Sequence, residues 1–202
     1  MTKIFAHRGA SAYAPENTME AFELAAKQGA DGIELDVHVT KDGEVVVTHD
    51  EKIDRVSNGS GFIKNMTLRE LKRLSFHNHM ESYVGAGIPT LREVLEYVST
   101  TNMDVNIELK TGIYWYPQIE EKTAFIVQET GMHDRVIYSS FNHHSIAKLK
   151  EIDSTAETAW LFSDVILDVE KYAKQNGVEG LHPAVYHMYM SDFMKRWNES
   201  GE

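Results

Sequence analysis

The chain has 202 residues, enough for one domain with a sizeable core. Its apolar fraction of 42% and charged fraction of 25% are typical of a globular protein and exclude a disordered one. A net charge of −11 argues against a general nucleic-acid binder, and the lack of cysteine excludes disulfides and thiolate metal sites. The opening residues lack the apolar core of a signal peptide and no window has the length of a membrane span, so we expect a cytoplasmic protein.

The N-terminal segment has the pattern of a strand followed by a helix. Residues 3–9, KIFAHRG, are predicted to form a short strand that ends in a loop. Residues 17–30 have the apolar periodicity of an amphipathic helix. Asn17 and Glu20 have the spacing of a helix N-cap and its reciprocal partner, so we expect the helix to begin there.

Two further strands follow, joined by a very short connection. Residues 32–39, GIELDVHV, and 45–50, VVVTHD, are predicted strands on either side of a turn that contains Asp-Gly. The connection is too short for a crossover helix, so the two strands form either a hairpin or an irregular step. Residues 55–89 come next, rich in glycine, histidine and asparagine, with one predicted helix at 67–74. We interpret them as an elaborated loop and not as a second domain.

Strands and helices then alternate along the remaining chain. The predicted strands are residues 105–110, 135–141, 158–162 and 178–186. The predicted helices are residues 90–101, 144–152, 165–176 and 191–202. This alternation indicates an α/β protein with a mainly parallel sheet, and the fold we expect is a TIM-type (β/α)8 barrel. Seven strands are counted, so the barrel lacks its eighth strand.

Polar residues gather at or near the carboxyl ends of the predicted strands, where α/β barrels keep their reactive groups. They are His7, Arg8, Glu34, Asp36, His49, Asp50, Glu108 and Lys110. Glu34 and Asp36 are two positions apart, so on a strand both side chains face the same way, and the same holds for Glu108 and Lys110. Burying such charges without compensation would be costly.

Two arrangements would compensate these charges. A divalent cation could be held by Glu34, Asp36 and Glu108, and carboxylate oxygens would select Mg²⁺ or Ca²⁺. Alternatively, Arg8 and Lys110 could neutralise the acids in an internal ion-pair network. The network explains any one pair better, but the gathering of all these groups at strand ends favours the metal site.

The two histidines add proton-transfer chemistry to this cluster. His7 and His49 suit general acid and base, because imidazole titrates near neutral pH. Arg8 suits a phosphate oxygen through its planar guanidinium, and Lys110 would offset charge gained in the transition state. Together these residues indicate a site that binds an anion and moves protons.

Five blocks of the sequence carry a family resemblance. They are AHRGASAYAPENTMEAF, GADGIELDVHVTKDGEVVVTHD, IPTLREVLEYV, NIELK and SSF, and the resemblance that they carry covers the chain from residue 4 to about residue 183. In this order and spacing they resemble the glycerophosphodiester phosphodiesterase family. The resemblance implies a barrel of the phospholipase C-like phosphodiesterase group, a divalent cation, and hydrolysis of glycerophosphodiesters to glycerol 3-phosphate and an alcohol.

The resemblance also implies roles for residues of this chain. By position, the acid/base histidines are His7 and His49, the metal carboxylates are Glu34, Asp36 and Glu108, and the phosphate-binding residues are Arg8 and Lys110. The family suggests attack by a glycerol hydroxyl on phosphorus, through a cyclic phosphate intermediate. Residues 55–89 match its inserted subdomain, which shapes the glycerol pocket, within a single barrel domain spanning residues 1–202.

Further residues are candidate substrate contacts. Glu16 either contacts the site or orders the loop before the first helix. The aromatic residues 114–116, YWY, either line the pocket mouth or pack against the inserted segment. Phe141 and His182 lie near later strand ends, where they could contact substrate.

The sequence departs from the family pattern at its C-terminal end. Family members finish with an eighth strand carrying a tryptophan, whereas this sequence stops in the preceding helix, where Trp197 is no substitute. An incomplete barrel would expose unpaired edges on the first and seventh strands. Three explanations stay open: the sequence is part of a longer chain, another chain supplies the missing edge, or the barrel opens and is less stable. We favour self-association, because pairing between two copies would cover both edges. Two alternatives to the hydrolase stay open: a non-catalytic or weakly active phosphodiester-binding relic, and a phosphodiesterase for lysophospholipids or phosphoinositol. The absence of a basic amphipathic helix disfavours a lipid-surface substrate.

Overall fold

The computed structural model describes residues 2–190 and 192–200. The strands of this part of the chain are β1 (Phe5–His7), β2 (Gly32–Val39), β3 (Val45–Val47), β4 (Asp104–Leu109), β5 (Val136–Ser140), β6 (Glu157–Phe162) and β7 (Gly180–Pro183). Six of them pair in parallel in the order β1-β2-β4-β5-β6-β7, and β3 pairs with β2. The α/β barrel-type fold is therefore confirmed, with β1 and β7 as the outer strands of the described parallel sheet.

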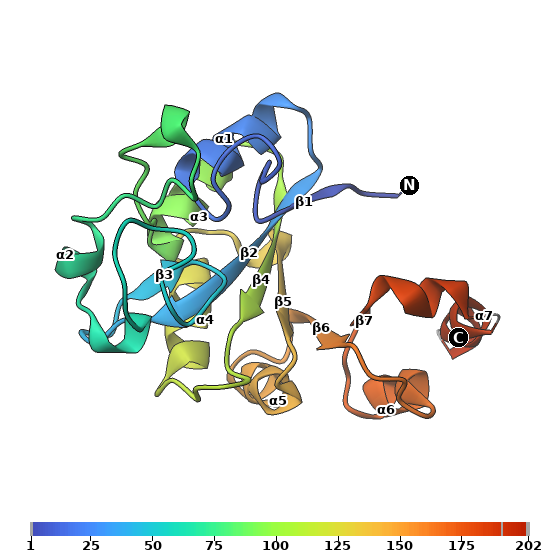
Figure 1. Cartoon of the computed structure of the whole chain (residues 1–202). Helices are drawn as coiled ribbons and strands as arrows, with labels where there is room; N and C mark the ends of the chain where they lie inside the picture. The colour runs from blue at the N-terminus through green and yellow to red at the C-terminus, as the bar shows by residue number, and fades with distance from the viewer. Residues whose placement is uncertain (1, 191, 201–202) are drawn as a thin grey trace.

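The helices alternate with these strands, as a barrel-type fold requires. They are α1 (Met19–Lys27), α2 (Leu68–Leu71), α3 (Leu91–Ser99), α4 (Ile119–Glu129), α5 (His143–Ile152), α6 (Val169–Gln175) and α7 (Phe193–Ser200). Helix α3 contacts α4, and α4 contacts α5, so that these three form a continuous layer beside the strands (Figure 1). Helices α6 and α7 contact each other next to β7, at the far end of the sheet in the same view.

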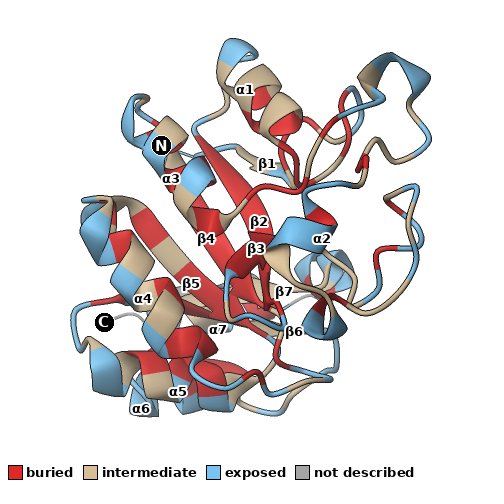
Figure 2. Ribbon diagram, turned by 90° about the vertical axis from the view of Figure 1, so that its left-hand side faces the viewer, coloured by how far each residue is buried: buried red, intermediate tan, exposed pale blue. Residues whose placement is uncertain are grey.

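Strand β2 is at the centre of the core. All eight of its residues are buried, and buried residues also dominate β4 and β5 beside it (Figure 2). Apolar side chains such as Leu35, Ile107 and Leu95 from β2, β4 and α3 belong to one buried cluster. Each such side chain contributes about 1.5–3 kcal/mol by leaving water, so the middle of the sheet is a stable platform for polar groups.

The connection between the second and third strands is a hairpin. Residues 37–39 of β2 pair antiparallel with 45–47 of β3, while residues 32–34 of β2 pair in parallel with β1. β1 and β3 thus lie along the same edge of β2, one beyond the other. The alternative of an irregular step is wrong, because the Asp-Gly turn reverses the chain immediately.

Helix α1 begins one residue later than predicted. Thr18 is the N-cap, and its Oγ1 accepts a hydrogen bond from the N–H of Ala21 at 3.4 Å. The predicted pair of Asn17 and Glu20 is wrong, because Asn17 has a left-handed backbone with φ of 57°. This conformation leaves the Asn17 amide free to reach β2.

Helix α4 is not among the elements that the sequence predicts. Its buried positions include the polar residues Glu120 and Thr123 beside Ile119 and Val127. These polar residues interrupt the apolar stripe by which an amphipathic helix is recognised. The buried carboxylate of Glu120 accepts a hydrogen bond from Ser145 at 2.7 Å, so its burial is compensated on the neighbouring helix α5.

The inserted segment, residues 55–89, follows β3 as predicted and builds a small core of its own. Its helix, predicted over 67–74, is the short α2. The buried apolar residues of this second cluster are Val46, Ile53, Val56, Ile63, Leu71, Phe76 and Ile88. Val45 and Val47 belong instead to the main core. Successive side chains of β3 therefore pack alternately into the main core and into the core of the inserted segment.

Two later elements are shorter than predicted. Helix α6 begins at Val169 because Asp168 before it has a positive φ of 53°. Strand β7 ends at Pro183 and is followed by a short 3₁₀ helix, Val185–Tyr189. The described part of the chain contains no helix with the length and apolar character needed to cross a membrane.

Candidate active site

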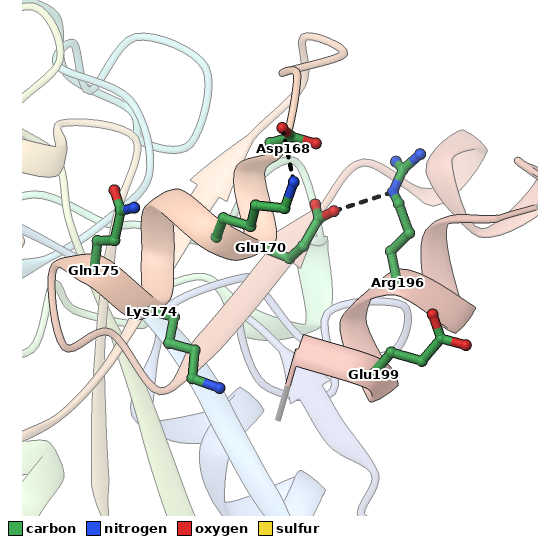
Figure 3. A pocket seen from close by; sticks show the side chains of 7 residues that line it. Asp168, Glu170, Lys174, Gln175, Arg196 and Glu199 are labelled. Atoms are coloured by element: carbon green, nitrogen blue, oxygen red, sulfur yellow. Dashed lines mark hydrogen bonds and ion pairs between the residues drawn. The ribbon is translucent and has the colours of Figure 1, made fainter. Parts of the chain in front are cut away.

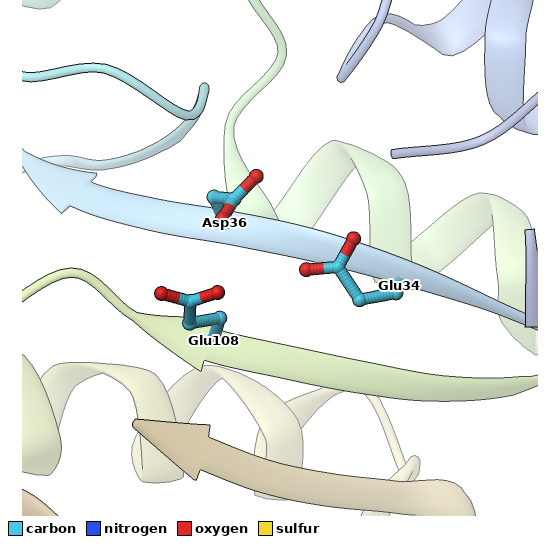
Figure 4. Close-up of side chains that lie close together, drawn as sticks. All are labelled: Glu34, Asp36 and Glu108. Carbon is cyan, nitrogen blue, oxygen red and sulfur yellow. The ribbon is translucent and has the colours of Figure 1, made fainter. Parts of the chain in front are cut away.

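Three carboxylates converge on the face shared by β2 and β4. In the parallel register Asp36 lies opposite Glu108, and Glu34 lies two residues before Asp36 on β2. One oxygen from each of the three carboxylates lies within 4.8 Å of the others, and all three residues are buried. Figure 4 shows the side chains on the same face of the two strands, as the two-residue spacing of Glu34 and Asp36 predicts.

The carboxylates repel one another. Burial, together with the charges of Asp36 and Glu108, raises the pKa of Glu34 to about 8. Burial also raises the pKa of Glu108, although the ammonium of Lys110 opposes this shift. Asp36 Oδ1 is buried without a hydrogen-bond partner. A buried acidic cluster with an oxygen that accepts no hydrogen bond is an environment in which a cation is stabilised.

Strand β1 brings His7 and Arg8 to this cluster. His7 pairs with Glu34 in the register, and its Nε2 lies 3.7 Å from Glu34 Oε2. Arg8 has a left-handed backbone with φ of 60°, and its N–H donates to both the backbone oxygen and the carboxylate of Glu34, each at 3.0 Å. Its Nε is buried 3.7 Å from Asp36 Oδ2 and has no hydrogen-bond partner.

Lys110 and His49 approach from the other side. Lys110 Nζ donates to Glu108 Oε1 at 2.8 Å and lies 3.2 Å from His49 Nε2. Burial opposes protonation, but the charges of Glu108 and Asp36 raise the pKa of Lys110. His49 Nδ1 is bonded to Asp50 Oδ1 at 2.7 Å, which leaves Nε2 as the nitrogen that faces the site.

A pocket of about 290 Å³ lies beside His49, Glu108 and Lys110, at the ends of β4 and β5. Its lining residues are His49, Glu51, Glu108, Leu109, Lys110, Gly112, Ile113 and Phe141. Phe141, a predicted substrate contact, is 52% exposed and forms part of the wall. The pocket can hold a small anion with an apolar extension against Phe141 and Ile113.

Glu16, the second candidate contact, lies in a network of arginines. Its Oε1 accepts from Arg8 Nη1 at 3.0 Å, and both of its oxygens accept from Arg55. Burial opposes ionisation, but the hydrogen bonds from Arg55 and the charge of Arg8 lower the pKa of Glu16. This position connects Glu16 to the site through Arg8.

The remaining candidates lie elsewhere. His182 is on β7, which β5 and β6 separate from β4 in the sheet. Of the aromatic residues 114–116, Tyr114 packs edge-on against Phe62 of the inserted segment, with ring centroids 6.0 Å apart. Trp115 is 68% exposed and lies beside His144 of α5.

Sequence reasoning missed two groups that support the site. The first is Asn17, whose side chain donates to Asp36 Oδ2 at 2.8 Å, a contact that its place after Glu16 could not reveal.

The second group is His38, which is buried. Its Nε2 lies 3.0 Å from the carbonyl oxygen of His49, and its Nδ1 lies 2.9 Å from the hydroxyl of Tyr116. Burial lowers the pKa of His38 to about 4, so it is neutral at pH 7. His38 is two positions after Asp36, so the two side chains lie on the same face of β2. This spacing was the signal by which the sequence could have identified His38.

A larger pocket, of about 520 Å³, lies between α6 and α7 (Figure 3). Its charged side chains pair among themselves: Asp168 with Lys171 at 3.1 Å, and Glu170 with Arg196 at 3.1 Å. None of the predicted site residues lines it. The geometry therefore favours the smaller pocket beside the carboxylates as the active site.

The comparisons with known proteins agree with this geometry. The profile of the glycerophosphoryl diester phosphodiesterase family matches residues 7–201. A glycerophosphodiester phosphodiesterase of Bacillus altitudinis is 47% identical over 92% of this chain and 76% of its own length. Another, from Caldanaerobacter subterraneus, is 43% identical over 93% of this chain and 77% of its own length.

Solved structures show the same fold. A glycerophosphodiester phosphodiesterase of Agrobacterium tumefaciens superposes with a TM-score of 0.84 at 32% identity, over 100% of this chain and 84% of the other. An Oleispira antarctica phosphodiesterase in complex with the product sn-glycerol-3-phosphate superposes with a TM-score of 0.89 at 28% identity, over 96% of this chain and 81% of the other.

The fold is that of an α/β-barrel phosphodiesterase. This chain belongs to the glycerophosphoryl diester phosphodiesterase family. It is an enzyme of that class, a phosphoric diester hydrolase.

Proposed function

We propose that the chain hydrolyses small glycerophosphodiesters to glycerol 3-phosphate and an alcohol, with a divalent cation. The observation that carries the proposal is the meeting of three buried carboxylates with basic residues and two histidines at one end of the sheet. The product bound in the Oleispira antarctica relative supports the same substrate class. The pocket of about 290 Å³ fits a small substrate.

The carboxylates of Glu34, Asp36 and Glu108 would hold the cation. Their donor set is oxygen alone, which suits Mg²⁺ or Ca²⁺. Two observations support the fit: the buried Oδ1 of Asp36 accepts no hydrogen bond, and the pKa of Glu34 is raised. A nearby positive charge would relieve both. When bound, the cation would supply charge neutralisation at the phosphate and a lower pKa for a coordinated hydroxyl.

Arg8 and Lys110 would bind the phosphate oxygens. The Nε of Arg8 lies 3.7 Å from Asp36 Oδ2, and the Nζ of Lys110 lies 3.6 Å from Asp36 Oδ1. A phosphate beside the carboxylates would therefore have two positive groups close to it. Guanidinium and ammonium groups held in place before reaction would stabilise the negative charge that grows in the transition state.

The two histidines would move protons in two steps. In the first, one imidazole takes the proton of a glycerol hydroxyl, whose oxygen forms a new bond to phosphorus. The phosphorus–oxygen bond to the alcohol breaks, and the other imidazole protonates the departing oxygen, which leaves a cyclic phosphate. Water opens the cyclic phosphate in the second step, with the two roles reversed. His49 would act through Nε2, because Asp50 occupies its Nδ1.

The remaining candidates take supporting roles in this proposal. Phe141 would contact the alcohol portion at the pocket wall. Glu16 would act on substrate through Arg8, which it holds. His182 stays a prediction from its strand-end position. A cytoplasmic location and self-association likewise remain predictions of the sequence.

Alanine variants of the two histidines test the proposal. His7→Ala and His49→Ala should each lower turnover at least about a hundredfold, because each loses a proton-transfer group. The assay follows glycerol 3-phosphate release from glycerophosphocholine and glycerophosphoethanolamine with Mg²⁺ or Ca²⁺, and with a chelator. His144→Ala, at an exposed position of α5, is the control.

Unchanged turnover in either variant would contradict the assignment of that histidine. No product from wild-type protein with either cation would favour a phosphodiester-binding protein over a hydrolase. Circular dichroism and the unfolding temperature of each variant separate a loss of chemistry from a loss of fold.

A further inference from the structure

Arg55 is the first residue of the inserted segment and forms a fork between two acidic side chains. Its Nε donates to Asp50 Oδ2 at 2.7 Å. Its Nη1 and Nη2 donate to the two oxygens of Glu16, at 2.9 and 2.8 Å. The planar guanidinium thus satisfies two carboxylates from different parts of the chain at once.

Each of these carboxylates in turn holds a residue of the active site. Glu16 Oε1 accepts from Arg8 Nη1 at 3.0 Å, and Asp50 Oδ1 is bonded to His49 Nδ1 at 2.7 Å. One hydrogen-bonded chain therefore connects the phosphate-binding arginine, through Arg55, to a proton-transferring histidine. Arg8 directly follows β1 and His49 follows β3 by two residues. These two strands pair with different halves of β2 and not with each other.

We propose that Arg55 is a positioning residue that holds Arg8 and His49 in their working orientations at the same time. The inference rests on the proposed function, since that function assigns the roles of Arg8 and His49. It adds a residue that touches neither the carboxylate cluster nor the pocket wall described above.

The backbone around Arg55 is rigid enough for this task. Ile53 and Val56, on either side of it, are 0% and 3% exposed in the small core of the inserted segment. The side chain of Arg55 is 43% exposed, so solvent screens its ion pairs and they contribute only modestly to the stability of the whole fold. Arg55 would matter for activity because it fixes the positions of Arg8 and His49. A misplacement of about 1 Å at a reacting group can lower the rate on the order of a hundredfold.

Lysine cannot replace this geometry. An ammonium group is a compact charge on a flexible stem, and it cannot bond both oxygens of Glu16 and one of Asp50 through a fixed plane. The inserted segment would then lose its connection to one or both acidic side chains. Arg8 and His49 would be free to adopt other rotamers, although the fold around them stays in place.

The first experiment compares Arg55→Gln, Arg55→Lys and Arg69→Gln in the glycerophosphodiester assay. We expect kcat/KM to fall about ten- to hundredfold in Arg55→Gln and less in Arg55→Lys. The unfolding temperature should change little. Arg69→Gln, at an exposed position of α2 in the same segment, should match wild type. Activity of Arg55→Gln equal to that of Arg69→Gln would overturn the proposal.

The second experiment asks whether Arg55 acts through its two partners. In a Glu16→Gln/Asp50→Asn background, adding Arg55→Gln should cost less than about twofold, because the connection is already weakened at both ends. Singly, Glu16→Gln should raise KM through Arg8, and Asp50→Asn should lower kcat through His49. A full loss from Arg55→Gln in the double background would show that Arg55 acts by another route and would contradict the positioning role.

A failure of the proposed function can be distinguished from a failure of the positioning role of Arg55. Wild-type protein that releases no glycerol 3-phosphate would contradict the hydrolase, and positioning would then be read directly from crystal structures of wild type and Arg55→Gln. We expect the Arg8 guanidinium and the His49 ring to move or become disordered in the variant. Unmoved side chains would overturn the positioning role whatever the activity.

Discussion

Arg8 illustrates how much of the site depends on single residues. Its φ of 60° is a conformation that costs a side-chain-bearing residue about 1–2 kcal/mol. The cost is offset by the two hydrogen bonds that its N–H donates to Glu34. The turn directs the guanidinium towards Asp36 and Glu16 instead of along the strand, so the local strain serves the site.

Asp50 provides a pH-dependent test at the same scale. Burial opposes ionisation, but hydrogen bonds from Arg55 and His49 lower the pKa of Asp50 to about 2. Its folded pKa lies below the ordinary value near 3.8, so its stabilising effect is complete above about pH 4 and is lost as the pH falls to 2. Asp50→Asn should therefore be less stable than wild type at pH 6, with the gap closing towards pH 2.

Urea unfolding at a series of pH values measures this gap, and the difference between the two proteins should correspond to the uptake of up to about one proton. Asp134→Asn, at an exposed carboxylate, is the matched control. A gap that stays constant from pH 6 to pH 2 would show that the ion pairs of Asp50 do not stabilise the fold.

At the scale of elements, the junction between β1 and α1 places the site residues. Gly9 follows Arg8 with φ of 79°, and a Cβ there would lie 2.7 Å from the backbone carbon of Ala21 in α1. The close approach brings the end of β1 directly against the first turns of α1. Only glycine satisfies both the left-handed backbone and this contact.

Gly9→Ala should destabilise the protein by about 2–5 kcal/mol, since it combines a left-handed alanine with a backbone clash. Activity per folded molecule should fall as well, because any shift of α1 moves Arg8. Thermal unfolding and the glycerophosphodiester assay measure the two effects. Gly87→Ala is the control, as a Cβ there meets nothing within 4 Å. Wild-type stability in Gly9→Ala would show that the junction is adaptable.

For the whole molecule, the proposed cation site predicts that cation binding stabilises the folded state. A cation bound only by the folded chain, present at a hundred times its Kd, would stabilise it by about 2.7 kcal/mol. For a chain of this length the unfolding temperature should rise by roughly 5–10 °C on addition of Mg²⁺ or Ca²⁺. Chelator should reverse the rise.

Asp36→Asn should remove most of this thermal shift, because it takes one of the three converging carboxylates from the cluster. Glu44→Gln, at an exposed carboxylate on the β2–β3 turn, should keep the shift and serves as the control. An equal shift in wild type and Asp36→Asn would place cation binding somewhere else on the molecule.

Much of the architecture could be predicted because it depends on local periodicity. The run GIELDVHV predicts β2 over the residues that form it, and the two-residue spacing places Glu34 and Asp36 on one face. Helix α4 could not be predicted in this way, because its buried positions include the polar residues Glu120 and Thr123, and a hydrogen bond from Ser145 of α5 compensates the burial of Glu120. Tertiary packing there overrides the local pattern.

The sequence by itself determined which reactive residue types lie at strand ends and which family they resemble, since both are properties of order and spacing along the chain. Only the tertiary structure decided that β2 and β3 form a hairpin, that Asn17 contacts Asp36, and that Arg55 joins Glu16 to Asp50. Two of these contacts, Asn17 with Asp36 and Arg55 with Glu16, connect residues that are 19 and 39 positions apart. Their geometry is set by strand register and by the close approach of α1 to β1, which no local pattern encodes.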